Sequence, residues 1–210
     1  MQIVTISREF GSGGRELGKR LADFFGCDYY DKEIITFIAS NKGMDENYVE
    51  RAIEQETWQK RPLTFRKAIA GISLHSVQTG LLLEQKKVIE QIAATGKDFV
   101  IVGRNADVLL KKYKPFNIFV CADMKAKISR CIEIDPEYRE LTAKEIEKKI
   151  RRVDKNRAQV CELISGNSWG DRYDYQLTLN TTDWNIKELT PVVAEFVKSW
   201  CGRTEVDSVI

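Results

Sequence analysis

The chain has 210 residues, of which 43% are hydrophobic and 30% are charged, and its formal net charge is +2. Such a chain can bury one substantial core, so we expect a single domain over residues 1–210. The near-neutral charge argues against a nucleic-acid-binding protein, and the lack of an apolar run of roughly 20 residues argues against a membrane span. Five scattered cysteines without a C-x-x-C pair argue against a disulfide framework and a zinc site, so we expect buried, reduced thiols in a cytoplasmic protein.

The first unit of the chain has the pattern of strand, glycine turn and helix. Residues 2–6 form an apolar run that is typical of a buried strand, and apolar positions recur at helical spacing over 15–25. A short extended segment at 27–30 follows. Asp31 is then predicted to cap a helix over 32–41.

The middle of the chain is mainly helical. A helix is expected over 45–56, and a long helix over 74–95. Between them, 57–73 has no clean period and contains Pro62, which predicts a loop-rich insertion. Packing of the long helix against a second copy, to give a homodimer, is an open alternative.

Apolar runs at 97–104, 116–123 and 175–182 predict further strands, the first two buried on both faces. A charged helix is expected over 141–164 and another from 184 or 185 to 200, with a loose tail over the last eight residues. This alternation predicts an α/β fold, with a three-layer parallel sheet covered by helices on both faces. Ligands of such sheets bind at the carboxyl ends of the strands.

The sequence "GSGG" at 11–14 lies between the first strand and the first helix. A glycine turn at this point aims backbone N–H groups and the helix dipole at one position, which favours a phosphate. The usual phosphate-binding loop, G-x-x-x-x-G-K-[S/T], is not matched, because Arg8 stands at the first glycine, Gly14 at the lysine and Arg15 at the hydroxyl residue. Arg15 can supply the missing positive charge. A tight connection without a ligand is the alternative reading of the turn.

Several segments, in their order, resemble the cytidylate kinase-like group of P-loop nucleoside monophosphate kinases. These segments are "VTISREFGSGGREL", "YYDKEII", "VIVGR", "NIFVCAD", "DKNRA" and "WGDRYDYQLTLNTT". The resemblance implies a P-loop NTPase architecture with an NMP-binding-type insertion at about 31–95 and a lid-type helical segment at about 135–172. It also implies transfer of the γ-phosphoryl group of ATP, with Mg²⁺, to a small-molecule acceptor, CMP or dCMP, without a nucleic-acid or membrane partner.

The same resemblance implies roles for individual residues. Those expected to bind the donor nucleotide are Arg8, Gly11, Ser12, Gly13, Gly14, Arg15 and Glu16. Those expected to bind the acceptor are Asp31, Lys32, Arg104, Asp107, Asp154 and Arg157. Those expected to act in catalysis are Arg15, Arg130, Arg151 and Arg157. Arginines suit this chemistry, because phosphoryl transfer needs positioning and cations that neutralise the charge of the phosphoryl oxygens. The missing lysine and hydroxyl leave open how Mg²⁺ is held, with Ser12, Asp31 or water as candidates.

Plainer readings stand beside these roles. Arg151, Arg152 and Lys155 also fit a solvated helix face. Trp169 has the chemistry to stack on a base, although packing is the commoner role of such a residue. His75, the only histidine, is interpreted as a surface or packing residue because no nucleophile motif accompanies it.

Two other functions stay open at this stage. The altered phosphate loop is compatible with a non-catalytic sensor or interaction protein that binds a phosphorylated ligand on the same fold. The basic helix at 148–157 is compatible with an RNA-binding module, against which the net charge argues.

Overall fold

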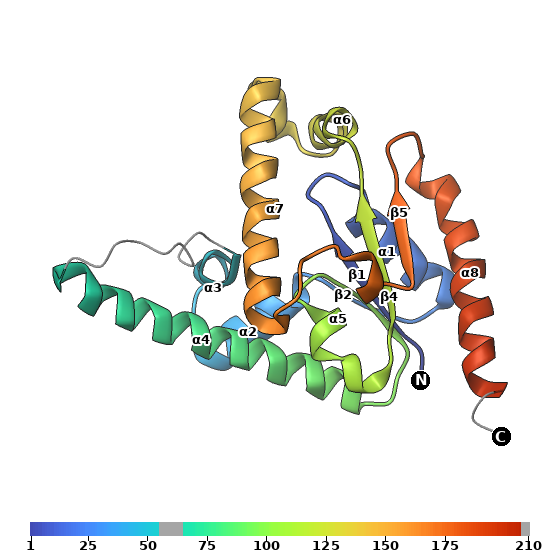
Figure 1. Ribbon diagram of the computed structural model, residues 1–210, viewed down its shortest axis with the longest axis horizontal. Helices are drawn as coiled ribbons and strands as arrows, with labels where there is room; N and C mark the ends of the chain where they lie inside the picture. Colours follow the sequence, from blue (N-terminus) through green and yellow to red (C-terminus); the bar gives the residue numbers. More distant parts are fainter. Residues whose placement is uncertain (55–64, 207–210) are drawn as a thin grey trace.

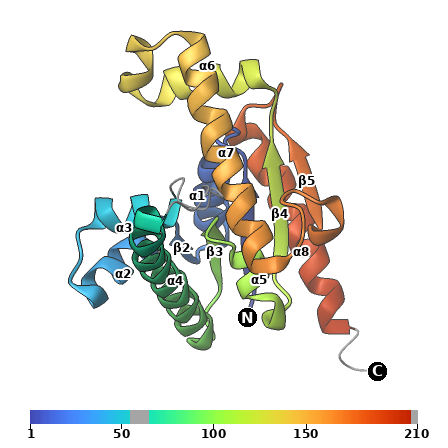
Figure 2. The same cartoon turned by 60° about the vertical axis from the view of Figure 1, so that its left-hand side comes forward.

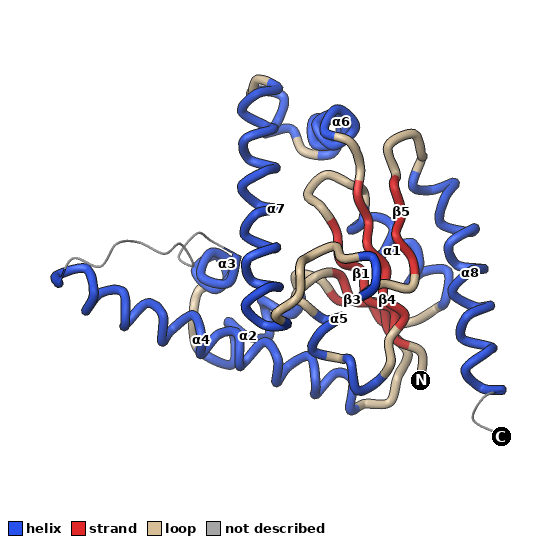
Figure 3. The backbone as a smooth tube through the Cα atoms, in the orientation of Figure 1, coloured by secondary structure: helices blue, strands red, loops and turns tan. Residues whose placement is uncertain are grey.

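A five-stranded parallel sheet lies at the centre of the computed structural model, which describes residues 1–54 and 65–206 (Figure 1). Figure 3 shows these strands in red with helices around them. The strands are β1 (Ile3–Arg8), β2 (Asp28–Tyr30), β3 (Phe99–Val102), β4 (Phe116–Cys121) and β5 (Leu177–Asn180). They lie in the order β2-β3-β1-β4-β5, and all four pairings are parallel. The expected α/β class with a parallel sheet is confirmed.

Helices cover both faces of the sheet. Figure 2 shows α2, α3 and α4 on one side of the molecule and α8 on the other. The α-helices are α1 (Gly14–Phe25), α2 (Glu33–Lys42), α3 (Glu46–Glu54), α4 (Phe65–Ala94), α5 (Ala106–Leu109), α6 (Met124–Ile134), α7 (Ala143–Ser165) and α8 (Ile186–Val206). The short 3-10 turns are η1 (Lys111–Tyr113), η2 (Pro136–Glu140) and η3 (Arg172–Asp174).

Two apolar clusters, one on each face, hold these layers together. Val4 and Ile6 of β1 pack with α1 and α8, whereas Ile3 packs with α2, α3, α4 and α5. This division follows from the alternation of side chains along a strand. Because both faces are covered, the strands β3 and β4 are apolar at nearly every position, as the sequence pattern indicated.

A third, smaller cluster joins α6, η2 and α7. Cys131, Tyr138, Ile146 and Ile150 are its buried members. The helix α7 begins at a capping box, in which Thr142 and Glu145 satisfy each other's backbone N–H groups. This segment therefore has its own local core and a well-defined start, and α7 continues from it toward the carboxyl ends of the strands.

The structure corrects three sequence-based expectations. Asp31 does not cap a helix, because α2 has Lys32 at its N-cap and the Asp31 carboxylate pairs with arginines instead. The segment 57–73 is not loop throughout, because α4 begins at Phe65; Pro62 precedes the helix and so does not interrupt it. The loose tail expected over the last eight residues is helical in part, because α8 extends to Val206. Residues 55–64 and the side chain of His75 lie outside the described part of the chain.

Other expectations concern membranes, metals and thiols. Within 1–54 and 65–206, no helix has the length and apolar character to cross a bilayer. In the same described residues, no group of three or more His, Cys, Asp or Glu side chains is placed to hold a metal ion. All five cysteines are free, as expected, but only Cys131 and Cys161 are buried, and the other three are half-buried.

The helix α1 lies close against the sheet at Gly18. A Cβ atom added there would lie 2.5 Å from Cγ2 of Val102. We expect Gly18→Val to lower the free energy of unfolding by about 1–3 kcal/mol because of overpacking, as measured by urea denaturation. The matched control is Gly80→Val on α4, where the added Cβ meets open space; its effect should stay within about 0.5 kcal/mol. Equal stability of the two variants would contradict this close approach.

Candidate functional site

The glycine turn between β1 and α1 forms one wall of a large cavity, with a volume of about 450 Å³. Gly11 and Gly13 have φ angles of +78° and +82°, which favour glycine. A Cβ atom on Gly13 would also lie 2.6 Å from Cδ1 of Ile186. The turn leads into the N-terminus of α1, a helix of 12 residues. Free N–H groups and the helix dipole at this point favour an anion such as a phosphate.

The larger cavity combines polar and apolar walls. The predicted donor-site residues on it are Arg8, Gly11, Gly13, Gly14, Arg15 and Glu16. The opposite wall carries apolar side chains from the turn itself and from α6 and η2, namely Phe10, Cys131, Ile134 and Tyr138. A turn that favours an anion, beside an apolar wall, has the chemistry to hold a nucleotide, with phosphates on the turn and a base on the apolar wall.

A second, smaller cavity of about 60 Å³ lies at the carboxyl ends of β1 and β3. Arg104 and Gln85 line it, together with Asn156 of α7 and Trp169. The Trp169 ring packs edge-on against Phe119 at 5.3 Å between centroids, so this side chain has a packing role while it borders the cavity. The cavity is lined by polar side chains that are themselves largely buried, such as Arg104 and Gln85.

Arg8 and Arg157 line both cavities and therefore lie where the two meet. Arg157 is on α7, and its Nη1 donates a hydrogen bond of 3.0 Å to the backbone carbonyl of Arg8. Burial, followed by the charge of Arg157, lowers the pKa of Arg8 to about 9. The charges of Arg104 and Arg15 act in the same direction, while Asp31 opposes them. A guanidinium remains charged at neutral pH, so the junction carries an excess of buried positive charge that an anion would relieve.

Asp154 lies 3.8 Å from Nη1 of Arg157, and Asp31 is the other carboxylate that partly balances this cluster. Its side chain is 4% exposed, and it lies 2.5 Å from Nε of Arg15 and 3.7 Å from Nη2 of Arg8. Arg15 is 56% exposed and so reaches the larger cavity from its rim. Both oxygens of Asp31 thus face arginines, so this residue orients Arg8 and Arg15.

The backbone at the end of β3 adopts an unusual turn. Gly103, Arg104 and Asn105 have successive φ angles of +74°, +61° and +52°. Non-glycine residues in this region are strained, and such strain concentrates at functional sites. The turn is held by a 3.0 Å hydrogen bond from the side-chain amide of Gln85 to the carbonyl of Arg104. Gln85 is 1% exposed, so it positions Arg104 from within the core.

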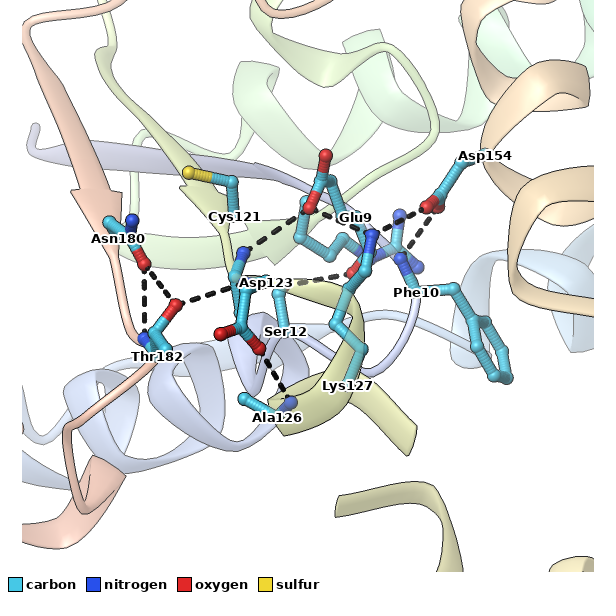
Figure 4. Close-up of polar contacts among 12 residues, drawn as sticks. Glu9, Phe10, Ser12, Cys121, Asp123, Ala126, Lys127, Asp154, Asn180 and Thr182 are labelled. Carbon is cyan, nitrogen blue, oxygen red and sulfur yellow. Dashed lines mark hydrogen bonds and ion pairs between the residues drawn. The ribbon is translucent and has the colours of Figure 1, made fainter. Parts of the chain in front are cut away.

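A network of charges attaches α7 to the glycine turn (Figure 4). The Asp154 carboxylate accepts a 2.6 Å hydrogen bond from the backbone N–H of Phe10 and lies 3.4 Å from Nζ of Lys127. Lys127 is buried and also lies 3.0 Å from a carboxylate oxygen of Glu9. Burial raises the pKa of Asp154, and the Phe10 N–H opposes that shift. Asp154 therefore orders the turn and lines neither cavity.

Sequence reasoning missed Lys127 and Glu9. Both residues look like ordinary surface charges in the sequence, Lys127 within the first turns of α6 and Glu9 directly after β1. The position of Lys127 in the sequence did carry one indication of a role. Lys127 follows β4, and the carboxyl end of β4 lies beside β1. Only the packing of α6 and α7 around the turn brings the three charges together.

Several predicted residues lie away from the junction. Arg130 borders the larger cavity, but its guanidinium donates to the hydroxyl and carbonyl of Thr181 and to the carbonyl of Trp184. The side chain of Arg151 is 67% exposed and pairs with Glu147 one turn earlier on α7. This placement matches the reading of that helix face as solvated.

Lys32 and Asp107, two predicted acceptor-site residues, line neither cavity. Lys32 is exposed at the start of α2. Asp107 is buried, which raises its pKa, while hydrogen bonds from Tyr175 and Ser7 oppose the shift. Ser7 borders the smaller cavity. Through its hydrogen bond with Ser7, Asp107 therefore stabilises the wall of that cavity without lining it.

The candidate magnesium ligands are engaged elsewhere. The Ser12 side chain is fully buried, and its hydroxyl donates a 2.9 Å hydrogen bond to the carbonyl of Glu9. Asp31 faces two arginines. Protein-bound Mg²⁺ usually takes one or two carboxylates or hydroxyls alongside phosphates and water. Neither residue is available for this in its present arrangement, so the two do not fit a preformed magnesium site.

The chain was compared with known families and structures. The model of the family described as "Cytidylate kinase-like family" matches residues 3–183. No curated protein matches the chain.

Solved structures share the fold at low sequence identity. An uncharacterized protein from Eubacterium ventriosum is 21% identical, with a TM-score of 0.69 over 95% of this chain and 99% of that chain. Shikimate kinase from Acinetobacter baumannii, in complex with shikimate, is 14% identical, with a TM-score of 0.56 over 95% and 94% of the two chains. Shikimate kinase from Bacteroides thetaiotaomicron is 13% identical, with a TM-score of 0.57 over 94% and 98%. These similarities show that the chain shares its fold with these structures.

The support that Gln85 gives to the strained turn is testable through stability. We expect Gln85→Ala to lower the free energy of unfolding by about 1–3 kcal/mol, because the buried carbonyl of Arg104 loses its hydrogen bond. Urea denaturation measures this change. Gln91→Ala, at an exposed position of the same helix, is the control and should change little. A Gln85 variant as stable as the control would mean that the turn does not depend on this amide.

Proposed function

The chain belongs to the cytidylate kinase-like family, and from this premise we propose that it is a phosphotransferase that transfers the γ-phosphoryl group of ATP to a nucleoside monophosphate. CMP or dCMP is the first acceptor to test, because of the family resemblance. The observation that carries the proposal is the meeting of the two cavities at Arg8 and Arg157. Phosphoryl transfer to a nucleoside monophosphate brings two anionic substrates end to end with cations between them, and two cavities that meet at arginines support this arrangement.

We assign the donor to the larger cavity. The phosphates of ATP would lie on the glycine turn at the start of α1, and its base against the apolar wall. The phosphate group of the acceptor would lie in the smaller cavity with Arg104. A volume of about 60 Å³ suits that group rather than a whole nucleotide. The cavity therefore favours an anionic acceptor without selecting a base.

In the proposed reaction, a phosphate oxygen of the acceptor attacks the γ-phosphorus of ATP. The bond from that phosphorus to the β–γ bridging oxygen breaks, and ADP leaves with the electron pair. Negative charge spreads over the transferring phosphoryl group, and guanidinium groups at the junction neutralise it. Arg157 is suited to this role because it borders both cavities. Mg²⁺ would accompany ATP as the usual complex of such kinases, and no step above depends on a protein ligand to it.

The domain assignment made from the sequence becomes part of the same proposal. The insertion at about 31–95 would bind the acceptor, and α4 of this segment contributes Gln85 to the smaller cavity. The segment at about 135–172 would act as the lid, and α7 of this segment contributes Arg157. Closure of a lid excludes water that would otherwise accept the phosphoryl group.

A non-catalytic phosphate-ligand sensor is the second candidate. It is favoured by Gly14 at the position of the P-loop lysine and by the engagement of Ser12 and Asp31 in other contacts. A sensor and a kinase would both bind nucleotide, so binding alone does not separate them.

Turnover with a panel of acceptors separates these candidates. The protein is mixed with ATP, Mg²⁺ and each nucleoside monophosphate, nucleoside or small hydroxy acid in turn, and ADP release is measured. We expect release that depends on a nucleoside monophosphate. Nucleotide binding by calorimetry together with no acceptor-stimulated ADP would support the sensor and reject the kinase.

Arg104 should decide acceptor affinity. We expect Arg104→Met to raise the KM for the acceptor about 10- to 100-fold, since hydrogen bonds to charged groups contribute about 1.5–3 kcal/mol and each 1.4 kcal/mol is tenfold. The KM for ATP should change much less. Lys111→Met, at an exposed position beyond α5, is the control. Equal effects on both substrates would contradict the assignment of the smaller cavity to the acceptor.

Arg157 should decide the rate of the chemical step. We expect Arg157→Ala to lower kcat by about 10³-fold, the lower range for an arginine that stabilises a transferring phosphoryl group. Arg152→Ala on the same helix, where the side chain is exposed, should leave kcat unchanged. The ratio of the two kcat values is the measurement. A ratio near one would show that Arg157 does not contribute to the chemical step.

A further inference from the structure

The position of the P-loop lysine is physically blocked in this chain. Gly14 stands where that lysine would be. A Cβ atom built on Gly14 would lie 2.6 Å from Cβ and 3.0 Å from Cγ of Arg8. Carbon atoms in favourable contact are about 3.5–4.0 Å apart. The first two carbons of the Arg8 side chain are close to the backbone and have little freedom to move, so a lysine at position 14 and an arginine at position 8 exclude each other.

The rest of the Arg8 side chain runs past a second glycine. A Cβ atom on Gly103 would lie 1.8 Å from Nη1 and 2.7 Å from Cζ of Arg8. The guanidinium therefore occupies the space that a side chain at position 103 would fill. Gly14 at one end and Gly103 at the other leave a channel for this one side chain, from the start of α1 to the end of β3.

Because the Arg8 side chain runs through this channel, its positive charge lies at the junction of the cavities. Arg8 is 8% exposed and lines both cavities. The P-loop lysine of the usual motif supplies a cation to the β and γ phosphates from the start of the helix. The Arg8 guanidinium, which lies against Gly103, supplies a cation where the two cavities meet, with a planar fork that suits phosphate oxygens.

We propose that Arg8 has exchanged roles with the P-loop lysine, so that its guanidinium contacts the transferring phosphoryl group of the donor. The inference rests on the proposed function and adds to it a catalytic residue and the reason for the missing lysine. Arg15, which the sequence suggested as the substitute, is half-exposed and held by Asp31 at 2.5 Å. Arg8 has the more buried position and is shared by both cavities.

The test is a reciprocal exchange of the two positions. Arg8→Gly removes the cation, Gly14→Lys adds a lysine against Arg8, and the double variant Arg8→Gly/Gly14→Lys restores the usual pattern in the cleared space. Arg8→Met keeps the length of the stem without charge and serves where Arg8→Gly does not fold. Arg51→Met, at an exposed position on α3, is the control. The readouts are kcat with ATP and the affinity for inorganic tripolyphosphate by calorimetry, with circular dichroism to confirm folding.

We expect Arg8→Met and Arg8→Gly to bind tripolyphosphate at least tenfold more weakly and to lower kcat by about 10³-fold. The double variant should recover at least tenfold in both readouts over Arg8→Gly, while Gly14→Lys alone should lose activity. Wild-type affinity in folded Arg8→Met would overturn the inference, as would a folded double variant no better than Arg8→Gly. If the wild-type protein turns over no acceptor, the proposed function fails, and the tripolyphosphate affinities still decide the role of Arg8.

Discussion

Buried positive charge is the constraint on which this site depends. Arg8 and Arg104 are both less than a tenth exposed, and Asp31 is the carboxylate that pairs with Arg8. Burying a charge without full compensation is costly, so the fold has to stabilise the arrangement elsewhere. The apolar clusters on both faces of the sheet supply this stabilisation, and an anion bound at the junction would offset the cost. Under the proposed function, that anion is a phosphate group of a substrate.

The fold was predictable because its signals are local. Unbroken apolar runs such as 116–123 indicate strands buried on both faces, and the glycine turn marks the first crossover. The errors also have local causes. Asp31 has the chemistry of a helix cap, but a nearby guanidinium attracts its carboxylate more strongly. The start of α4 was not predicted because Pro62 indicated a loop, whereas the helix begins three residues later, at Phe65.

The site was predictable only in part, because its contacts join distant segments. The glycine turn and Arg104 were found from motifs, and both border cavities. The relative importance of Arg8 and Arg15 was not accessible, since it depends on Gly103, which lies far along the chain and packs against Arg8. Lys127 was missed for the same reason: α6 and α7 have to pack around the turn before its partners Glu9 and Asp154 are near it.

The interlocking of Arg8, Gly14 and Gly103 has a consequence for descent. The Arg8 side chain occupies space that Gly14 and Gly103 leave empty, so changes at position 8 are not independent of changes at the two glycines. A lineage that moves between the lysine form and the arginine form of the loop has to pass through an intermediate that has neither cation, because the two together collide. Related chains should therefore fall into two separate groups at these positions, with few mixed combinations, and a search pattern that demands the lysine would overlook one group entirely.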